Sequence, residues 1–558
     1  MGVLVDPPQR DSAGGRPSDE TQALPAHPAV TSTSTTATAP VTGAGEPKLA
    51  EPPITGGRVE AFMGRIIRVL SHSRLARPLP AVILSVLGLC GVAFVGLCAT
   101  AYRPSVATPP VLLPLTTVAR NLGAPHLPDL VANFIMYFSV ALCALGLAMM
   151  LWANSRGWSP NPRKVFWTAA AGIAVLVNIT PVGSSDVASY AAYGRIAAMG
   201  YNPYTFTPAM LPGGKDNVYT ELVSRQWQGT ASVYGPLATW THLLAAWIGG
   251  DRPWLTIWVL MIMVGAAFLA TGYVLLRTAE NPVRAVLLWV ANPLLIVELV
   301  MGGHLDAFLA LFAIAAVAVS RSGTALPRAP GQVGTEWAAA GPRKPQPRWK
   351  NAALAGARNR LAQDFIVGLF VGLALGIKVN AAFVALAVAI PLMHDRSWGR
   401  LARTGAVAGL TAFGLYFFSY GLVALEPLRK ASAMVISPTL WRLVQVTVQH
   451  YYGNGAEATV TSTFGIIWPP VMLLLAWYLY NRLSPDVPTV VAATCALTFA
   501  WIVVAPWSLP WYSAIAWVAL ALLPRNSLTR WLTIATLALG LLHFNGGHLT
   551  NERIGPTP

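Results

Sequence analysis

One aspartate begins the stretch of this sequence that is best suited to group-transfer chemistry. Asp186 follows a Gly-Ser-Ser turn and precedes "VASYAAYGRIAAM", which places Tyr190, Tyr193 and Arg195 after it at helical spacing. An ionised carboxylate can accept the proton of a hydroxyl group that attacks another centre, and the ordinary aspartate pKa of about 3.9 keeps it ionised at neutral pH. An aspartate after two serines is also a common helix N-cap. The local sequence therefore leaves a catalytic base and a simple cap open.

Further ionisable residues stand at the edges of apolar stretches. "GGHLDAF" places His304 and Asp306 at the start of one such stretch, and Lys378 and Asn380 lie between two short ones. Ionisable groups near membrane depth are costly and are candidates for function. The first two could instead form a hydrogen-bonded pair that ends a helix. Lys378 could neutralise a phosphate or extend its amine to the membrane interface.

Two later segments combine aromatic with basic residues. "SPTLWRLVQVTVQHYYGNG" contains Arg442 and His450, and "PWSLPWY" contains Trp507 and Trp511. Arginine is suited to phosphate, and aromatic faces are suited to sugar rings or lipid. An interfacial helix and an aromatic belt would have the same composition, so both interpretations stay open.

The elements that position these residues are predicted by composition. The chain has 558 residues, of which 54% are hydrophobic and 11% are charged, and its mean hydropathy is +0.53. Soluble domains carry about 25% charged residues, so we expect an all-α polytopic membrane protein. The formal charge of +16 follows membrane topology, which argues against nucleic acid as a partner. The four cysteines lack the spacing of a metal site.

Hydropathy and the distribution of basic residues predict about thirteen spans, with the N-terminus in the cytoplasm and the C-terminus outside. The segment 321–363 is rich in Lys and Arg and is expected to be cytoplasmic. For that reason 233–250 should lie along the outer interface without crossing, and 364–393 should be a hairpin and not one long helix. The expected spans are 79–101, 131–153, 163–182, 255–277, 283–301, 306–320, 364–378, 379–393, 404–424, 464–481, 489–505, 511–523 and 529–543.

The same orientation defines the expected domain organisation. Residues 1–57 are rich in Pro, Ala, Thr, Ser and Gly and are expected to form a disordered cytoplasmic tail. A transmembrane catalytic domain should follow at 58–545, with large extracytoplasmic loops at 183–254 and 425–463. Residues 546–558 should form a short extracytoplasmic tail.

Three stretches together carry a family resemblance. "SYAAYGRIAAMGYNPY", then "VYGPLATW" with Tyr234, then "ANPLLIVELVMGGHLDAF" resemble the GT-C glycosyltransferases, which are polytopic enzymes with interfacial helices on the extracytoplasmic side. Within that group the chain is most similar to the actinobacterial polyprenol-phosphate-mannose-dependent α-1,6-mannosyltransferases of the Mpt type. The resemblance covers roughly residues 75 to 545 and excludes the N-terminal tail.

The resemblance implies a function and roles for individual residues. Asp186 matches the acid that acts as general base on the acceptor, and His304 and Lys378 match polar groups near the donor phosphate. The implied donor is polyprenyl-phosphate-mannose, and the implied acceptor is a mannan or phosphatidylinositol-mannoside-type lipoglycan, at the plasma membrane. No metal or other cofactor is expected. A transferase for another polyprenyl-linked sugar such as arabinose, and a transporter or flippase for a lipid-linked sugar, are the alternatives.

Overall fold

The computed structural model describes residues 78–98, 111–322, 360–431, 435, 439–453 and 457–543, all within the second of two compact units, Ile67–Pro558. Our expectations for the tail 1–57, for the terminal segment 546–558 and for most of the basic segment 321–363 lie outside the described residues.

The described part of the chain is helical and contains no β-strand, as the composition predicted. Short helices alternate with long apolar ones throughout. The helices are α2 (Pro78–Leu97), α3 (Pro114–Asn121), α4 (Asp129–Ser155), α5 (Pro162–Leu176), α6 (Asp186–Ala198), η3 (Pro208–Met210), η4 (Gly214–Asp216), α7 (Val218–Leu222), η5 (Arg225–Trp227), α8 (Pro236–Gly249), α9 (Pro253–Thr278), α10 (Pro282–Leu288), α11 (Pro293–Leu295), η6 (Ile296–Met301), α12 (Asp306–Ser322), α14 (Arg360–Ile377), η9 (Val379–Ala381), α15 (Ala382–His394), α16 (Trp398–Ser419), η10 (Leu422–Leu425), α17 (Glu426–Ala431), α18 (Leu440–Tyr452), α19 (Glu457–Asn481), α20 (Thr489–Val504), η12 (Pro510–Ser513), α21 (Ala514–Leu522) and α22 (Leu528–His543).

Among the described residues, six helices are long and apolar enough to cross a membrane, and one bent helix pair raises the number to as many as seven. Four further apolar helices are shorter, with 10–17 residues. A straight span needs about 20 residues, so the expected total of about thirteen spans stays a prediction. The six are α2, α4, α9, α14, α16 and the part of α19 from Ser462 to Asn481.

The stretch expected as a span at 283–301 forms a bent helix pair, so its assignment as one span stays a prediction. The segment is broken between Leu288 and Pro293 and is bent by 40°. Pro293 has no N–H to continue a helix, and the buried Asn292 side chain caps the new helix by accepting hydrogen bonds from the backbone N–H groups of Leu294 and Leu295. A short π-helix, η6, then completes the segment.

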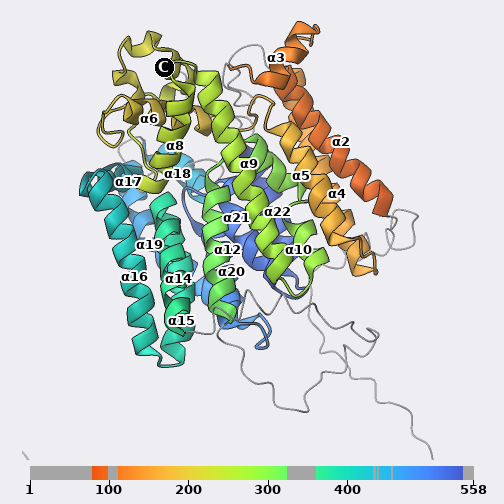
Figure 1. Ribbon diagram of the computed structural model, residues 1–558, viewed down its shortest axis with the longest axis vertical. Coiled ribbons are helices and arrows are strands. Elements are labelled where there is room, and N and C mark those ends of the chain that lie inside the picture. Colours follow the sequence, from red (N-terminus) through yellow and green to blue (C-terminus); the bar gives the residue numbers. More distant parts are fainter. Residues whose placement is uncertain are drawn as a thin grey trace, which may run out of the picture. The chain divides into compact units, whose positions relative to one another are not determined.

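The contacts at the two ends of α14 identify the two ends of the helix bundle. Gln363, in its first turn, donates hydrogen bonds to the carbonyls of Val319 and Ser320 at the end of α12. Lys378, directly after its last residue, binds Asp306 at the start of α12. The two helices are therefore antiparallel, and we call the two ends the Asp364 end and the Lys378 end. Figure 1 shows α12 and α14 side by side.

The stretch 364–393 is a helical hairpin, as expected from its charges. Helix α14 stops at Ile377, and α15 starts at Ala382 after the 3₁₀ turn η9. Arg400 and Arg403 near the start of α16 bind Asp364 near the start of α14. Helix α15 must therefore return from the Lys378 end to the Asp364 end, which leaves Lys378 at the tip of the hairpin.

Helix α8 begins and ends at the same end of the bundle and so does not cross it. At its start, Gly235 donates its N–H to the carbonyl of Ile377 at the Lys378 end. At its finish, Gly249 lies against Thr256 in the first turn of α9. The far end of α9 is at the Asp364 end, because Arg321 of α12 bonds to the carbonyl of Thr278 there. This agrees with the expectation for 233–250.

Candidate functional site

Asp186 does not cap a helix. It is the first residue of α6, and Ser185, at the N-cap position, makes no capping hydrogen bond through its side chain. The hydroxyl oxygen of Ser184 accepts the backbone N–H of Asp186 at 3.1 Å. The interpretation of Asp186 as the capping residue is therefore wrong, and its carboxylate is left to interact with other side chains.

Those groups are a tyrosine one helical turn away and a histidine from another segment. The Tyr190 hydroxyl donates to Oδ2 of Asp186 at 3.5 Å, and Nδ1 of His304 lies 3.7 Å from the same oxygen. The His304 ring is buried and stacks on Trp511, with ring centroids 3.6 Å apart. The Asp186 side chain itself keeps 25% of its surface exposed, so a solvent-borne hydroxyl can reach it.

The surroundings of Asp186 change its acidity. Burial raises the pKa of this carboxyl to about 6; the positive charge of Lys378 opposes that rise, the negative charge of Asp306 adds to it, and hydrogen bonds from Tyr190 and Tyr234 lower it. A carboxylate with a pKa of about 6 is a stronger base than an ordinary aspartate and remains mostly ionised at neutral pH. The sequence predicted ionisation but not this rise.

A buried ion pair lies beside this carboxylate. The amine Nζ of Lys378 is 2.7 Å from Oδ2 of Asp306, whose side chain is only 1% exposed. Aromatic rings surround the amine: it lies 4.2 Å from the ring centroid of Tyr512 and 5.7 Å from that of Tyr234. These contacts hold the cation in place and keep it from extending to the interface, which was the structural alternative for Lys378.

A cavity of about 460 Å³ joins these groups. Its wall combines polar side chains with tryptophan and leucine side chains. Asn380 has a special position, because it is buried and neither atom of its amide group has a hydrogen-bond partner in the described part of the chain. The residues that line the cavity are Asp186, Ser189, Tyr193, Trp227, Thr230, Val233, Tyr234, Lys378, Val379, Asn380, Leu425, Leu428, Trp501, Trp507, Leu509 and Tyr512.

Most of the residues that the sequence singled out lie at this cavity or directly behind it. Four of them pack behind the wall without lining it: Tyr190, His304, Asp306 and Trp511. His304 therefore contacts the carboxylate, although we expected it near the donor phosphate. The residues from the sequence analysis that do line the cavity are Asp186, Tyr193, Tyr234, Lys378, Asn380 and Trp507.

Three other residues from the sequence analysis do not line the cavity. Arg195 forms an ion pair with the exposed Asp251, because α6 turns it away from Asp186. Arg442 donates to the side chain of Gln445, and the ring of His450 contacts that of Tyr451 at 5.1 Å.

Several wall residues were missed in the sequence. Trp227 and Thr230 belong to the long connection between α6 and α8, and Leu425 and Leu428 lie at η10 and α17. Trp501, in the last turn of α20, stacks on Tyr512 with centroids 5.1 Å apart. A search for aromatic residues next to "PWSLPWY" could have found Trp501, whereas no sequence signal marks the two leucines.

The arrangement combines a base, a cation and a mixed wall. Asp186 can take a proton from a hydroxyl group, and Lys378 can stabilise negative charge that develops across the cavity. Tryptophan and leucine side chains can contact an apolar chain or a sugar ring. These features suit transfer of a group from an anionic, partly apolar donor to a hydroxyl.

The fold and this site together define the class: a polytopic α-helical membrane protein with a base and a cation at one end of its helix bundle. The chain belongs to the MptA/B family of mannosyltransferases. The profile of that family, described as alpha-(1->6)-mannopyranosyltransferase, N-terminal domain, matches residues 85–394, which is more than half of the chain. All the carboxylates and the lysine described above lie within the matched residues.

Individual relatives agree with the family. The chain is 25% identical over 376 residues to alpha-(1->6)-mannopyranosyltransferase A of Corynebacterium glutamicum, a match that covers 62% of this chain and 68% of the relative. It is 27% identical to a probable alpha-(1->6)-mannopyranosyltransferase of Mycolicibacterium smegmatis, covering 62% of each. A Mycobacterium tuberculosis alpha-(1->6)-mannopyranosyltransferase is 28% identical, covering 59% of this chain and 61% of the relative. No solved structure matches the chain significantly.

Proposed function

We propose that this chain transfers mannose from polyprenyl-phosphate-mannose to a hydroxyl of a mannan or lipoglycan acceptor, forming an α-1,6 linkage. Its family supports mannose transfer. The observation that carries the mechanism is the placement of Asp186 and Lys378 on the wall of one cavity. The basic residues concentrated in 321–363 support an active site on the extracytoplasmic face of the plasma membrane.

The proposed step is a single displacement. The acceptor hydroxyl oxygen attacks the anomeric carbon, and its proton passes to the Asp186 carboxylate. The bond between the anomeric carbon and the phosphate oxygen breaks, and polyprenyl phosphate leaves with the electron pair. Lys378 stabilises the charge of the departing phosphate. Attack opposite to the leaving group inverts the anomeric centre, so a β-linked donor gives an α-linked product.

We propose that this step needs no metal ion. The donor phosphodiester carries a single negative charge, and Lys378, which is fixed by Asp306, supplies a cation for the second charge that develops as the phosphate monoester leaves. Activity in the presence of a chelator such as EDTA should therefore equal activity without it. Loss of activity on chelation that a divalent cation restores would contradict this part of the proposal.

The decisive experiment compares Asp186→Asn with the wild type in membranes supplied with polyprenyl-phosphate-mannose and a short α-mannoside. The substitution keeps the size of the side chain and removes the base, so turnover should fall at least ~10²-fold, a usual contribution of general-base catalysis. Asp251→Asn is the matched control, because Asp251 is exposed and forms an ion pair with Arg195, away from the cavity. Near-normal turnover in Asp186→Asn would refute the mechanism, and movement of the donor without bond formation would favour a flippase.

A further inference from the structure

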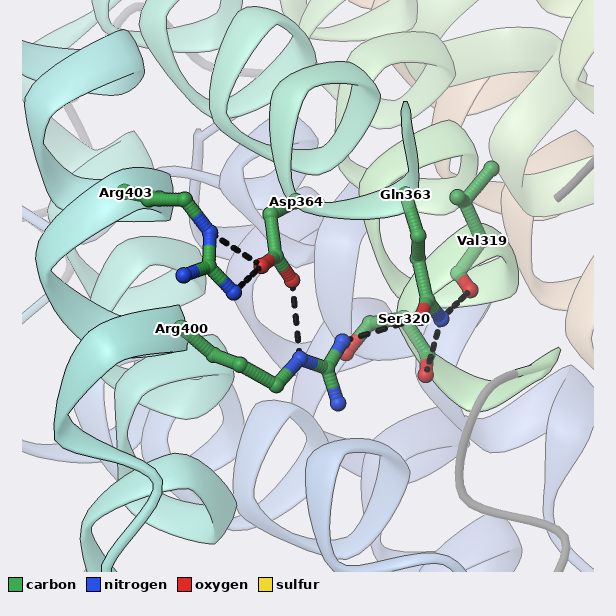
Figure 2. A network of polar contacts seen from close by, with 6 residues as sticks. All are labelled: Val319, Ser320, Gln363, Asp364, Arg400 and Arg403. Atoms are coloured by element: carbon green, nitrogen blue, oxygen red, sulfur yellow. Dashed lines mark hydrogen bonds and ion pairs between the residues drawn. The ribbon is translucent and has the colours of Figure 1, made fainter. Parts of the chain in front are cut away.

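A second polar cluster lies at the Asp364 end of the bundle, away from the cavity. The Asp364 side chain is 1% exposed and accepts hydrogen bonds from two arginines of α16 (Figure 2). Arg400 donates through Nε to Oδ1 at 2.9 Å, and Arg403 donates through Nε and Nη2 to Oδ2 at 3.0 and 2.7 Å. Along α14, the step of 14 positions from Asp364 to Lys378 corresponds to a rise of about 21 Å, so the cluster is remote from the cavity.

The cluster carries more positive charge than Asp364 can neutralise. Two guanidinium groups face one carboxylate, which leaves a formal charge of +1. The Nη2 atom of Arg400 donates a hydrogen bond to the side-chain oxygen of Gln363. In the described part of the chain, Nη1 of neither arginine donates a hydrogen bond. A single arginine would satisfy a carboxylate in a bidentate pair, so the second one is available for another anion.

The unpaired nitrogens are accessible. The Arg403 side chain is 45% exposed and that of Arg400 is 18% exposed, and Figure 2 shows Nη1 of Arg403 pointing away from Asp364. Because Asp364 and Gln363 fix both side chains, an anion would find the guanidinium groups already oriented. Less conformational entropy is then lost on binding than with two free surface arginines.

The surface beside the cluster is apolar and has the character of a lipid contact. Helix α16 exposes large apolar side chains along its length, among them Leu410, Phe413 and Phe417, and only 11% of its apolar stretch is buried. At the level of the arginines, Trp398 is 60% exposed, and tryptophan is enriched where hydrocarbon meets headgroups. Acyl chains can therefore lie along α16 with a headgroup at Arg400 and Arg403.

We propose that Arg400 and Arg403 bind the phosphodiester headgroup of an anionic phospholipid in the leaflet opposite to the cavity. The charge of the cluster matches that of one phosphodiester, and basic pockets between transmembrane helices bind such headgroups. The site should bind a complete lipid better than its headgroup alone, because α16 supplies apolar contacts for the acyl chains. It does not depend on the reaction proposed above.

The test measures bound lipid instead of activity. The full chain is reconstituted in nanodiscs of phosphatidylcholine with or without phosphatidylglycerol, then released and weighed by native mass spectrometry. Arg403→Gln keeps the Arg400–Asp364 pair and should reduce retained phosphatidylglycerol about five-fold, the effect of one arginine near a headgroup. Arg482→Gln is the matched control: Arg482 lies over Tyr478 and precedes α20, whose other end reaches the cavity, so it is an exposed arginine at the same end.

The outcomes separate the alternatives. Unchanged retention in Arg403→Gln, or an equal loss in Arg482→Gln, would overturn the proposal, because the second result means diffuse attraction only. Glycerol phosphate that stabilises the wild type against heat as well as the lipid does would show a free-phosphate site instead. Should Arg403→Gln fail to fold, Arg403→Lys keeps the charge but not the guanidinium fork, and it should retain less lipid than the wild type. Equal retention by the lysine variant would overturn the assigned geometry.

Discussion

Replacing Lys378 with methionine tests whether the cation controls the basicity of Asp186. The side chains have similar length, so the change mainly removes a positive charge that opposes the raised pKa of about 6 at Asp186. An opposite charge within reach commonly lowers a carboxyl pKa by 1–3, so its loss should place the pKa of Asp186 at about 7–9. The ionised fraction of Asp186 at about pH 7 would fall from roughly nine-tenths to one-half or less.

The direction of the pH effect follows from the role of the base. Only ionised Asp186 can accept the proton, so activity is lost as the pH falls through its pKa. In the wild type the acid limb of kcat/KM should lie near pH 6, the pKa that burial gives Asp186. In Lys378→Met that limb should move to higher pH. Weaker phosphate binding should also lower kcat/KM at the pH optimum, but that loss does not affect the position of the limb.

The assay is mannose transfer from polyprenyl-phosphate-mannose to a short α-mannoside over a range of pH. Lys378→Arg keeps the charge and should keep the limb where the wild type has it. Lys378→Met leaves Asp306 buried without its partner, which could cause misfolding. The double variant Lys378→Met with Asp306→Asn removes both charges and so controls for this effect. Its acid limb should lie between those of Lys378→Arg and Lys378→Met. An unmoved acid limb in a folded Lys378→Met protein would refute the electrostatic coupling.

Two further predictions concern the packing that supports the site. A Cβ atom at Gly235 would collide with the backbone of Gly376, so Gly235→Ala should destabilise the protein by about 1–3 kcal/mol and lower the midpoint of thermal unfolding. Gly409→Ala is the control, because the added atom meets nothing within 4 Å, and it should leave the midpoint unchanged. Equal midpoints for the two variants would contradict the close contact at Gly235. His242 stacks on Tyr190 with ring centroids 5.0 Å apart, and neither of its buried ring nitrogens has a hydrogen-bond partner among the residues that the structure describes. Burial lowers its pKa to about 3. His242→Phe should therefore retain activity and raise stability by about 1–3 kcal/mol; an inactive phenylalanine variant would mean that the ring nitrogens are used in the reaction.

Depth in the membrane could be predicted from the sequence. The ends of the long apolar runs placed Asp306 at the start of a helix, and these ends together with the distribution of basic residues placed Lys378 at the tip of a hairpin, as the structure has them. The excess of basic residues in 321–363 gave the non-crossing course of 233–250. Both signals depend only on how composition changes along the membrane normal. Exposing a charge to hydrocarbon is costly, so this change in composition is a reliable guide to depth.

Rotation about the helix axes could not be predicted in the same way. Apolar helices such as α20 carry apolar side chains on every face, so no periodicity indicates which face meets the cavity. Trp501 was therefore missed. Helix α16 begins at Trp398, before the expected span at 404–424. Its first turns contain Arg400 and Arg403, which bind Asp364 on another helix.

The ion pairs at both ends of α14 explain how a membrane helix can place a charge accurately. Asp306 and Asp364 are each 1% exposed and each bind a cation from a neighbouring helix or loop. Removing one partner of such a pair leaves a buried uncompensated charge and costs about 3–5 kcal/mol. A slide of α14 along α12 and α16 would break both pairs at once, so the hairpin tip is fixed in depth. The proposed mechanism requires this precision, because a cation that stabilises a leaving phosphate must be in place before the charge develops.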